Sequence, residues 1–504
     1  MTDIRPLTAH RHRSGVLLTG ALCLTAAAAW AIHHGYQAAQ YGQHSSRLAV
    51  VWAATFLLLA AQTVLYHCER PRRTTPRARR RLDALHVAVL LPVYNEDPGY
   101  LRLGLESFLA QTRRPTSVHL VDDGSTTGTY PEVRAWWLAA ARAAGIHATW
   151  QRQPNSGKRH AQAAAARQAW DADVYVSVDS DSCLAPNALE ELLLPFAKPR
   201  VQSVAGIVLG TNARANLLTR VTDLWFTTGQ LTDRSALSAT GTVLVNSGPL
   251  AAYRGPVLRD NLAGYLNEWF LGRPVMFSDD SLLTLYALLR GQTVQQPSAV
   301  VFTALPERVR HFRKMYMRWM RGSTIRSVWR FRYLPLTGWA YWTHLLKWFQ
   351  VALSTAVLGW LLVVEPVAYG RTPPASFIVV PFLIGWAQAL RYLSIARSDE
   401  TLSGRLVTWL MMPLAVIGGW TVLRCMRWYG MATCARTEWG TRKSGAEVAL
   451  DTPAMVQPAP VLPDDDTLRT RLPVAKLLDP DTEQTLTLPI PRQRTAAPMP
   501  ERTA

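Results

Sequence analysis

Five apolar stretches constrain the fold of this chain more than any other feature. Two precede and three follow a long central region, and they cover residues 16–32, 48–66, 349–364, 377–390 and 406–423. The first two are close to the ~20 residues that a helix needs to cross the hydrocarbon core of a membrane. We therefore expect an α-helical transmembrane bundle combined with a large soluble region.

The first stretch allows two readings. Arg11 and Arg13 precede it and small residues end it, which is also the pattern of a cleaved signal peptide. A second stretch follows at once, and this favours a transmembrane hairpin over residues 1–69.

The charged residues are unevenly distributed. The 504 residues include 54 Lys and Arg against 35 Asp and Glu, a formal net charge of +19. Seven arginines directly follow the second stretch: Arg70, Arg72, Arg73, Arg77, Arg79, Arg80 and Arg81. Basic residues concentrate on the cytoplasmic side of membrane spans, whereas a nucleic-acid site would need them on a folded surface. The pattern predicts a multi-pass protein of the inner (plasma) membrane with a cytoplasmic central region, and it argues against nucleic acid as a partner.

The central region, residues 86–306, alternates short β-branched runs with longer helical stretches. This alternation is typical of an α/β domain with a mostly parallel sheet covered by helices. The clearest predicted strands are residues 87–93, 118–121, 174–178 and 201–208, and the predicted helices are residues 101–111, 133–144, 158–170 and 186–196.

Three further segments follow this domain. Residues 307–340 interleave arginines with aromatic side chains, a pattern suited to amphipathic helices that lie along lipid headgroups. Residues 341–434 contain the last three apolar stretches. Residues 446–504 are rich in proline, threonine and charge, and we expect a disordered tail there.

The number of spans creates a conflict. Two spans before the domain and three after it would place residues 435–445 outside, but the arginines of this region favour the inside: Arg424, Arg427, Arg436 and Arg442. A re-entrant stretch would resolve the conflict. So would an additional crossing within residues 406–434, where Pro413 and Gly418-Gly419 could break a helix.

Polar side chains gather where the predicted strands end. The first strand leads into Pro92, Tyr94 and Glu96, and the second ends in Asp122 and Asp123. The carboxyl ends of adjacent strands are where α/β sheets bind ligands. The base and ribose of a nucleotide need such acceptors, although an acidic turn by itself is weak support for one.

A third strand leads into Asp179 and Asp181, which point to the same side of an extended segment. Hard cations bind nucleoside diphosphates through one or two carboxylates plus phosphate oxygens. We predict Asp181 as the ligand of Mg²⁺ or Mn²⁺ and Asp179 as support for the nucleotide. An acidic N-cap ahead of the helix at Pro186 is the alternative. Lys158 and Arg159 open a helix after a flexible loop, where a diphosphate could meet backbone donors.

The order of these motifs resembles that of the membrane-embedded processive family 2 glycosyltransferases, most closely hyaluronan synthases and nodulation-type chitooligosaccharide synthases. The resemblance covers residues 16–442 and implies a GT-A-like catalytic domain. The family's nucleotide-binding acidic turn, its Gly-Lys-Arg segment and its metal-binding acid–x–acid motif correspond to Asp122-Asp123, Lys158-Arg159 and Asp179-Ser180-Asp181.

Two later motifs complete a catalytic centre by the same resemblance. Ser247-Gly248-Pro249 with Tyr253-Arg254 matches the segment that holds the acceptor sugar, without the cysteines that commonly flank it. Asp279-Asp280 matches the family's Gly-Asp-Asp motif, with Ser278 where glycine is usual, and Asp280 maps onto the general base.

The resemblance also assigns residues beyond this domain. Arg318-Trp319 ends the Gln-x-x-Arg-Trp motif, in which Met315 replaces the glutamine and cannot make a comparable hydrogen bond. Trp319 would offer a flat face to the acceptor sugar and Arg318 a cation near the pyrophosphate. Trp439-Gly440-Thr441-Arg442 matches the gating segment that closes over bound nucleotide.

These assignments agree with the chemistry of glycosyl transfer. A divalent metal and cations stabilise the leaving nucleoside diphosphate, while a carboxylate removes the proton of the acceptor hydroxyl. One base and one metal site favour an inverting displacement. We expect a UDP-sugar donor, UDP-N-acetylglucosamine with or without UDP-glucuronate, and a growing β-linked polysaccharide that is exported across the membrane.

Tryptophans could line the export path, although interfacial belts explain most tryptophans of membrane proteins. The candidates are Trp342, Trp348, Trp360, Trp386, Trp409 and Trp420. Two alternatives stay open: a non-processive transferase that glycosylates a lipid, and a catalytically degenerate scaffold, which only Met315 and Ser278 support.

Overall fold

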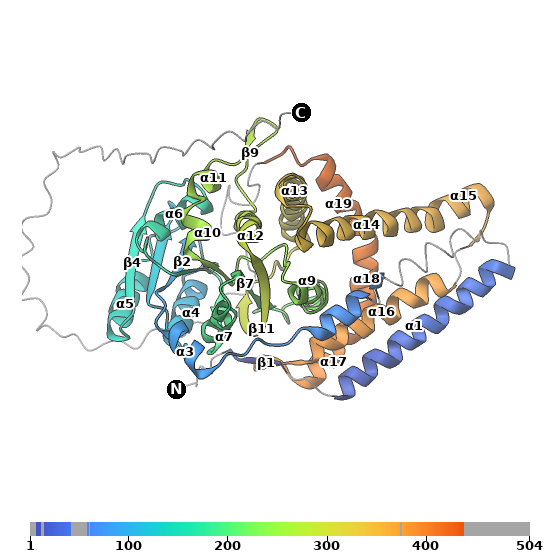
Figure 1. Ribbon diagram of the computed structural model, residues 1–504, viewed down its shortest axis with the longest axis horizontal. Coiled ribbons are helices and arrows are strands. Elements are labelled where there is room, and N and C mark those ends of the chain that lie inside the picture. The colour runs from blue at the N-terminus through green and yellow to red at the C-terminus, as the bar shows by residue number, and fades with distance from the viewer. Residues whose placement is uncertain (1–6, 12–14, 42–57, 60, 373–374, 438–504) are drawn as a thin grey trace, which may run out of the picture. The chain divides into compact units, whose positions relative to one another are not determined.

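An eight-stranded sheet forms the centre of the fold. The computed structural model describes residues 7–11, 15–41, 58–59, 61–372 and 375–437. The strand order is β4-β3-β2-β5-β8-β7-β11-β6, and helices cover both faces (Figure 1). The strands are β2 (Val87–Val93), β3 (Ser117–Asp122), β4 (His147–Arg152), β5 (Val174–Ser177), β6 (Cys183–Leu184), β7 (Val201–Gly210), β8 (Ala251–Arg254) and β11 (Gln292–Thr303).

The sheet is mostly parallel, as predicted. Strands β4, β3, β2 and β5 pair in parallel, and so do β7 and β11. Strand β8 runs antiparallel between β5 and β7. The sequence pattern did not show β4, β6, β8 or β11, because β4 is partly exposed, β6 has two residues and β8 four, and β11 contains three glutamines and Pro297.

Two hydrophobic clusters fix the helices to the sheet. On one face lie α4 (Pro98–Leu109), α5 (Pro131–Ala143) and α7 (Ala188–Leu193), with Phe108 and Trp137 fully buried. On the other lie α6 (Lys158–Arg167), α10 (Gly255–Arg259), α11 (Leu262–Leu266) and α12 (Asp279–Arg290).

Local signals set the helix starts. Oδ1 of Asp97 accepts hydrogen bonds from the N–H groups of Gly99 and Tyr100, and this cap begins α4 before the predicted residue 101. Pro186 lies ahead of the N-cap of α7 rather than inside the helix, which continues as a 3₁₀ turn over Leu194–Ala197.

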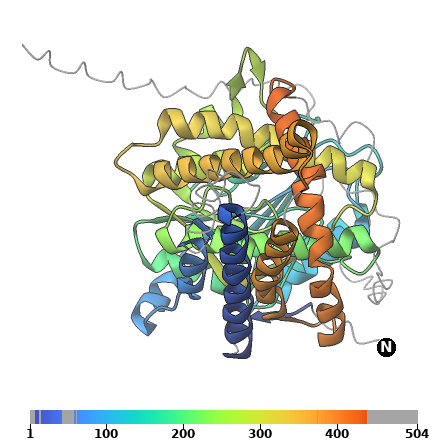
Figure 2. The ribbon, with the colours of Figure 1, turned by 90° about the vertical axis from the view of Figure 1, so that its right-hand side faces the viewer.

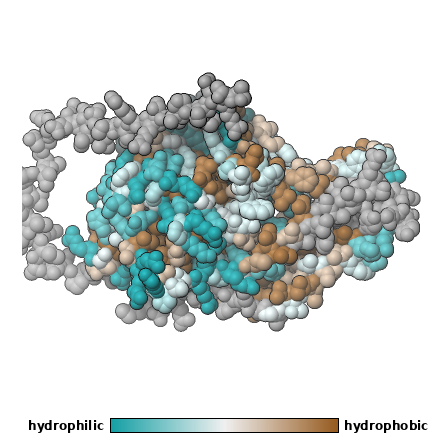
Figure 3. All heavy atoms as spheres, in the orientation of Figure 1, coloured by the Kyte–Doolittle hydropathy of each residue, from teal (hydrophilic) through white to brown (hydrophobic). Residues whose placement is uncertain are grey.

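Apolar helices extend from this domain. They are α1 (Gly15–Tyr41), the run of α14 (Trp339–Gly359), a π-helical turn (Trp360–Val364) and α15 (Glu365–Tyr369), and α16 (Ala375–Leu393). Helices α1 and α16 lie side by side (Figure 2). Hydrophobic side chains gather on this part of the molecule, whereas the visible surface over the sheet is mainly hydrophilic (Figure 3).

Among the described residues, three helical segments are long and apolar enough to cross a membrane: Leu17–His34, Trp339–Tyr369 and Leu402–Ala432. They contain the first, third and fifth predicted stretches. The fourth lies in α16, whose apolar part, Val379–Leu393, is shorter. Most of the second, residues 48–57 and 60, lies outside the described residues.

The last of these runs starts and ends beside the sheet domain. It consists of α17 (Leu402–Leu410), α18 (Met412–Trp420) and α19 (Val422–Ala432), with breaks next to Pro413 and Gly418-Gly419. Just before it, Tyr392 donates a hydrogen bond to Asp223 of α8 (Leu217–Gly229). After it, the carbonyl of Ala435 accepts one from Arg273 at 3.4 Å. Both ends of the run therefore face the same domain.

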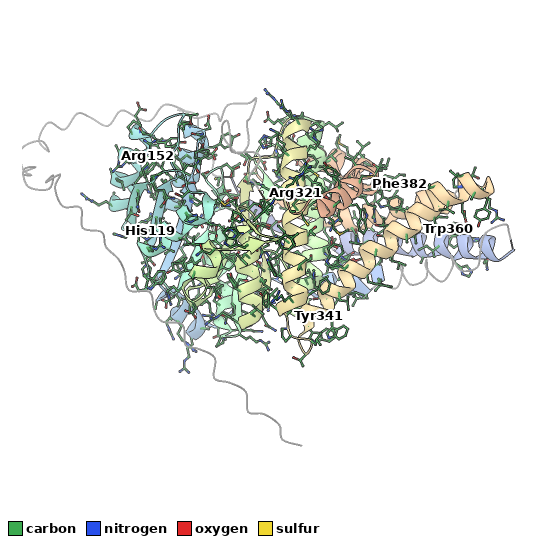
Figure 4. All side chains as sticks on the ribbon, turned by 90° about the horizontal axis from the view of Figure 1, so that it is seen from above. His119, Arg152, Arg321, Tyr341, Trp360 and Phe382 are labelled. Atoms are coloured by element: carbon green, nitrogen blue, oxygen red, sulfur yellow. The ribbon has the colours of Figure 1, made fainter. Side chains whose placement is uncertain are left out.

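Helix α13 (Val309–Tyr333) connects the two parts. Figure 4 shows Arg321 on this helix, between the sheet with His119 and Arg152 and the apolar helices with Trp360 and Phe382. Its basic aromatic sequence predicted a helix on lipid headgroups. In the structure one face of α13 packs on α12 and α19, and Arg326 and Arg330 are buried within the protein.

Candidate active site

Lys158 joins three of the predicted motifs at the carboxyl ends of the strands. It is the first residue of α6, and its Nζ donates to Oδ1 of Asp179 at 2.7 Å and lies 3.3 Å from Oδ2 of Asp279. Lys158 and Asp279 are buried, whereas the side chain of Asp179 is 28% exposed. These three residues, hereafter the Lys158 cluster, form an ionic group that opens to solvent at Asp179.

The predicted acceptor segment lies against this cluster. Because β8 runs antiparallel to β5, residues 247–249 come just before the strand end that faces the carboxyl end of β5. A β-carbon at Gly248 would lie 3.1 Å from Oδ2 of Asp179 and 3.4 Å from Nζ of Lys158. A side chain at position 248 would press on the Lys158 cluster, and glycine avoids this contact.

The same topology separates the two halves of the predicted acceptor segment. Tyr253 donates a hydrogen bond from its hydroxyl to the carbonyl of Asp280 at 3.2 Å. Arg254 lies at the far end of β8 and donates to the carbonyls of Val201 and Phe196. The expectation that Arg254 holds the acceptor is therefore wrong.

Asp279 and Asp280 begin α12 and have opposite electrostatic surroundings. Burial, followed by the negative charge of Asp279, raises the pKa of Asp280 to about 7. Burial alone would also raise the pKa of Asp279, but the charges of Lys158 and Arg159 outweigh it and lower that pKa. One carboxylate thus stays charged while its neighbour exchanges a proton near neutrality, the division of roles that acid–base chemistry needs.

Ser278, the departure from the family's glycine, has the backbone conformation that favours glycine. Its φ is +65°, in the left-handed region. Its side chain occupies space above Gly322 of α13, where a β-carbon would lie 2.6 Å from Oγ of Ser278. Ser278 Oγ also lies 2.7 Å from Oγ of Ser281. Serine is accommodated at 278 because α13 has glycine opposite it.

The carboxylates of the acidic turn after β3 accept hydrogen bonds from nearby backbone N–H groups. Oδ1 and Oδ2 of Asp123 accept hydrogen bonds at 2.9 Å from the N–H groups of Ser156 and Gly157. Oδ1 of Asp122 accepts one from Ser125 at 2.8 Å. Asp123 therefore holds the loop that leads to Lys158, a role that the sequence did not reveal.

The other nucleotide-binding candidates lie at the ends of the same strands. Pro92 is buried within β2 and Tyr94 is half-buried after it. Oε2 of Glu96 accepts a hydrogen bond from Ser180 Oγ at 2.7 Å, which places Glu96 beside the segment with Asp179 and Asp181.

Asp181 is half-buried, and its Oδ1 accepts a hydrogen bond from Thr303 at 3.0 Å. In the part of the chain that the structure describes, no three His, Cys, Asp or Glu side chains group as a cage for a metal ion. A Mg²⁺-type ion needs only one or two carboxylates when a diphosphate and water supply its other oxygens. Asp181, with Asp179 two residues away, fits a cation bound in this way.

Arg159 has partners other than the predicted diphosphate. Its guanidinium is buried and donates to Oε2 of Glu268 at 2.8 Å and to the carbonyl of Phe277 at 2.6 Å. Sequence analysis missed Glu268, because a single glutamate between a short helix and a hairpin matches no motif.

Trp319 belongs to an aromatic group on α13 and α8. Its ring centroid lies 5.1 Å from that of Phe226 and 6.4 Å from that of Tyr316. Arg318, the preceding residue, is half-buried, and Met315 is buried.

The predicted gating residues lie outside the described residues: Trp439, Thr441 and Arg442.

A cavity of about 750 Å³ leads from the acceptor segment to the apolar helices. Ser247 and Arg234 are among its lining residues, and Nη1 of Arg234 donates to Oγ of Ser247 at 2.5 Å. Two of the six candidate tryptophans, Trp348 and Trp420, are among the lining residues, and the other four are not.

The sheet is mostly parallel, and acidic residues lie at the carboxyl ends of β2, β3 and β5 and at the start of α12. This arrangement is that of a glycosyltransferase domain of the GT-A type. The chain belongs to glycosyl transferase family 2, and it is an enzyme of the glycosyltransferase class. The family's sequence model, "Glycosyl transferase family 2", matches residues 88–262, and "Glycosyl transferase family group 2" matches residues 176–395.

Two relatives of known name agree with this assignment. A hyaluronan synthase of Streptococcus pyogenes is 34% identical over 364 residues, 71% of this chain and 83% of the relative. An N-acetylglucosaminyltransferase of Rhizobium meliloti is 30% identical over 367 residues, 72% of this chain and 82% of the relative. Among solved structures, a mannosyltransferase of Pyrobaculum calidifontis covers 84% of this chain and is covered over 99% of its own, with a TM-score of 0.44 and 20% identity.

Proposed function

We propose that this chain is a processive, inverting glycosyltransferase that uses a UDP-sugar to extend a β-linked polysaccharide and export it across the inner membrane. The observation that carries the proposal is the Lys158 cluster with Gly248 packed against it and a cavity that the neighbouring Ser247 helps to line. This arrangement supports a donor site beside an acceptor segment, with the cavity as the proposed exit. The Rhizobium relative is named an N-acetylglucosaminyltransferase, which supports UDP-N-acetylglucosamine as a donor, with or without UDP-glucuronate.

On the donor side, the ammonium group of Lys158 would lie beside the diphosphate. It would then interact with the diphosphate as well as with Asp179 and Asp279. Asp181 would hold Mg²⁺ or Mn²⁺, whose positive charge stabilises the leaving diphosphate, and Asp179 would support the nucleotide. The proposed contacts of the nucleotide are Asp122, Asp123, Tyr94 and Glu96. Asp123 contributes by holding the loop before Lys158 in place.

On the acceptor side, Asp280 removes the proton of the attacking hydroxyl. The oxygen forms its bond to the anomeric carbon as the bond to UDP breaks, so one displacement inverts the configuration. The pKa of about 7 suits this base, since it is largely deprotonated just above neutrality and still accepts a proton. We propose Trp319 as the flat surface under the acceptor sugar and Arg318 as a cation near the pyrophosphate.

The contacts of the apolar helices support a topology that removes the counting conflict. Residues 339–369 leave the domain, and α16 returns to it, since Tyr392 at its end donates to Asp223 of α8. Residues 402–432 begin and end beside the domain. We propose two crossings after the catalytic domain and a surface-lying final run, which leaves Trp439, Thr441 and Arg442 on the cytoplasmic side with the nucleotide.

The test is UDP release by the purified protein in nanodiscs with Mg²⁺ or Mn²⁺, across UDP-sugars offered singly and in pairs. We expect turnover and a long product with inverted configuration. A single added sugar on a lipid would support the non-processive alternative, and retention of configuration would exclude the proposed displacement. A folded protein that is silent with every donor would indicate the degenerate scaffold.

A further inference from the structure

Glu268 is the centre of a buried ionic group outside the motifs described above. It precedes the hairpin of β9 (Trp269–Phe270) and β10 (Arg273–Pro274). Its Oε2 accepts from Arg159 at 2.8 Å, and its Oε1 accepts from Arg326 and from Nε1 of Trp329 at 2.8 and 2.9 Å. The side chains of Glu268, Arg159 and Arg326 are at most 6% exposed.

The Arg159 arm of this group reaches the donor side. Arg159 directly follows Lys158 on α6, and it donates to the carbonyls of Phe277 and Tyr265 at 2.6 and 3.2 Å. Phe277 is two residues before Asp279. The arm therefore ties the start of α6 to the segment that enters α12.

The Arg326 arm reaches the start of α12 from the other side. Its Nε donates to Oγ of Ser281 at 3.3 Å, and its Nη2 lies 3.5 Å from the carbonyl oxygen of Ser278. Ser278 and Ser281 flank Asp279 and Asp280 in the sequence. The guanidinium thus contacts the turn of backbone that presents the proposed base.

The charges of the group argue for positioning rather than for stability alone. Two guanidinium groups share one carboxylate, and burial of charges costs several kcal/mol per ion, which well-packed apolar residues would avoid. The planar guanidinium group of arginine can make several directed hydrogen bonds at once. Burial by itself would raise the pKa of Glu268, but Arg326 and Arg159 lower it, so the carboxylate stays charged.

We propose that Glu268 is a positioning residue of the glycosyl transfer reaction, acting through two arms. Arg159 aligns Lys158 with the donor, and Arg326 aligns Asp280 with the acceptor hydroxyl. This inference rests on the proposed function, and it predicts that the two arms affect different kinetic constants.

The experiment compares Arg159→Lys and Arg326→Lys, which keep the charge but lose the fork. Donor KM and kcat for UDP release are measured in nanodiscs beside wild type, with thermal unfolding as a check of folding. Arg326→Lys is expected to lower kcat by roughly tenfold with little change in donor KM, because misplacement of a reacting group reduces the rate of the chemical step. Arg159→Lys is expected to raise donor KM by roughly tenfold with a smaller change in kcat.

Two further variants complete the experiment. Glu268→Gln leaves two buried cations without a counter-charge and should change both constants. Arg290→Lys is the matched control, since Arg290 forms a partly exposed pair with Asp260 at the other end of α12, and it should change neither.

The outcomes separate the two proposals. Folded Arg159→Lys and Arg326→Lys proteins with wild-type constants, or with the same change in both constants, would overturn the role of Glu268 while leaving the proposed function intact. If Glu268→Gln does not fold, the two lysine variants still decide. A wild-type protein that releases no UDP from any donor would overturn the proposed function and this inference with it.

Discussion

Lys158 and Arg397 each bridge two aspartates, but their surroundings differ. Arg397 donates to Asp223 at 2.8 Å and makes two bonds of 2.7 Å to Asp399. Arg397 and Asp223 are almost fully buried, and Asp399 is 20% exposed. Lys158 bonds Asp179 with a single ammonium group, and Asp179 is partly exposed. A guanidinium fork in a closed site holds its partners in one geometry, whereas an ammonium at an open site can exchange partners. The Arg397 group thus joins α8 to the segment after α16, and the Lys158 cluster can accept a ligand.

The largest expected effect is on activity and concerns the open site, the Lys158 cluster with Asp280. Asp280→Asn removes the proposed base without changing its size, and we expect UDP release to fall by roughly 10²–10⁴-fold. Thermal unfolding should change little, because the backbone contacts of α12 remain. The control is Asp260→Asn, which follows α10 and pairs with Arg290 at the far end of α12. Unchanged turnover in Asp280→Asn would show that another group removes the proton.

A substitution in the Arg397 group, the closed site, should lower stability rather than activity. Arg397→Met leaves Asp223 buried without its cation, and breaking a buried pair costs about 3–5 kcal/mol. We expect a lower unfolding temperature in detergent, by about 10 °C, with a near-normal kcat for the molecules that stay folded. A large loss of kcat at normal stability would contradict the division between a structural and a functional cluster.

The contact of Ser278 with Gly322 offers a sharper test of how the open site is held. Gly322→Ala should push against Ser278 and displace Asp279 and Asp280, at a cost of about 1–3 kcal/mol typical of overpacking. Adding Ser278→Gly should restore activity, because it removes the opposing side chain and suits the positive φ. The measurement is UDP release by both single variants and the double variant. Equal activity of Gly322→Ala with and without Ser278→Gly would show that the two residues act independently.

The mildest perturbation is a change of pH. Only deprotonated Asp280 can act as the base, so kcat/KM should rise with pH and level off above about 7. Below that value it should fall about tenfold for each pH unit. A flat kcat/KM profile between pH 5 and 8 in folded protein would exclude Asp280 as the titrating base.

Much of the site could be predicted because its residues lie in local motifs. Lys158, Asp179 and Asp279 each stand at the end of a strand or the start of a helix, and parallel strands bring such positions to one edge of a sheet. Glu268 could not be found in this way, since its partners Arg159 and Arg326 are more than 50 residues away from it on either side. Arg254 was misassigned because the direction of β8 was not visible in four residues.

The sequence by itself determined the class of fold, the apolar helices and the motifs of a family 2 glycosyltransferase, because these depend on periodicity and on residues close together in the chain. Only the tertiary structure decided that Asp123 holds the loop before Lys158 and that Gly322 makes room for Ser278. It also decided that residues 402–432 return to the domain. Each of these depends on contacts between segments far apart in the chain, and hydrophobic packing of the whole molecule sets which segments meet.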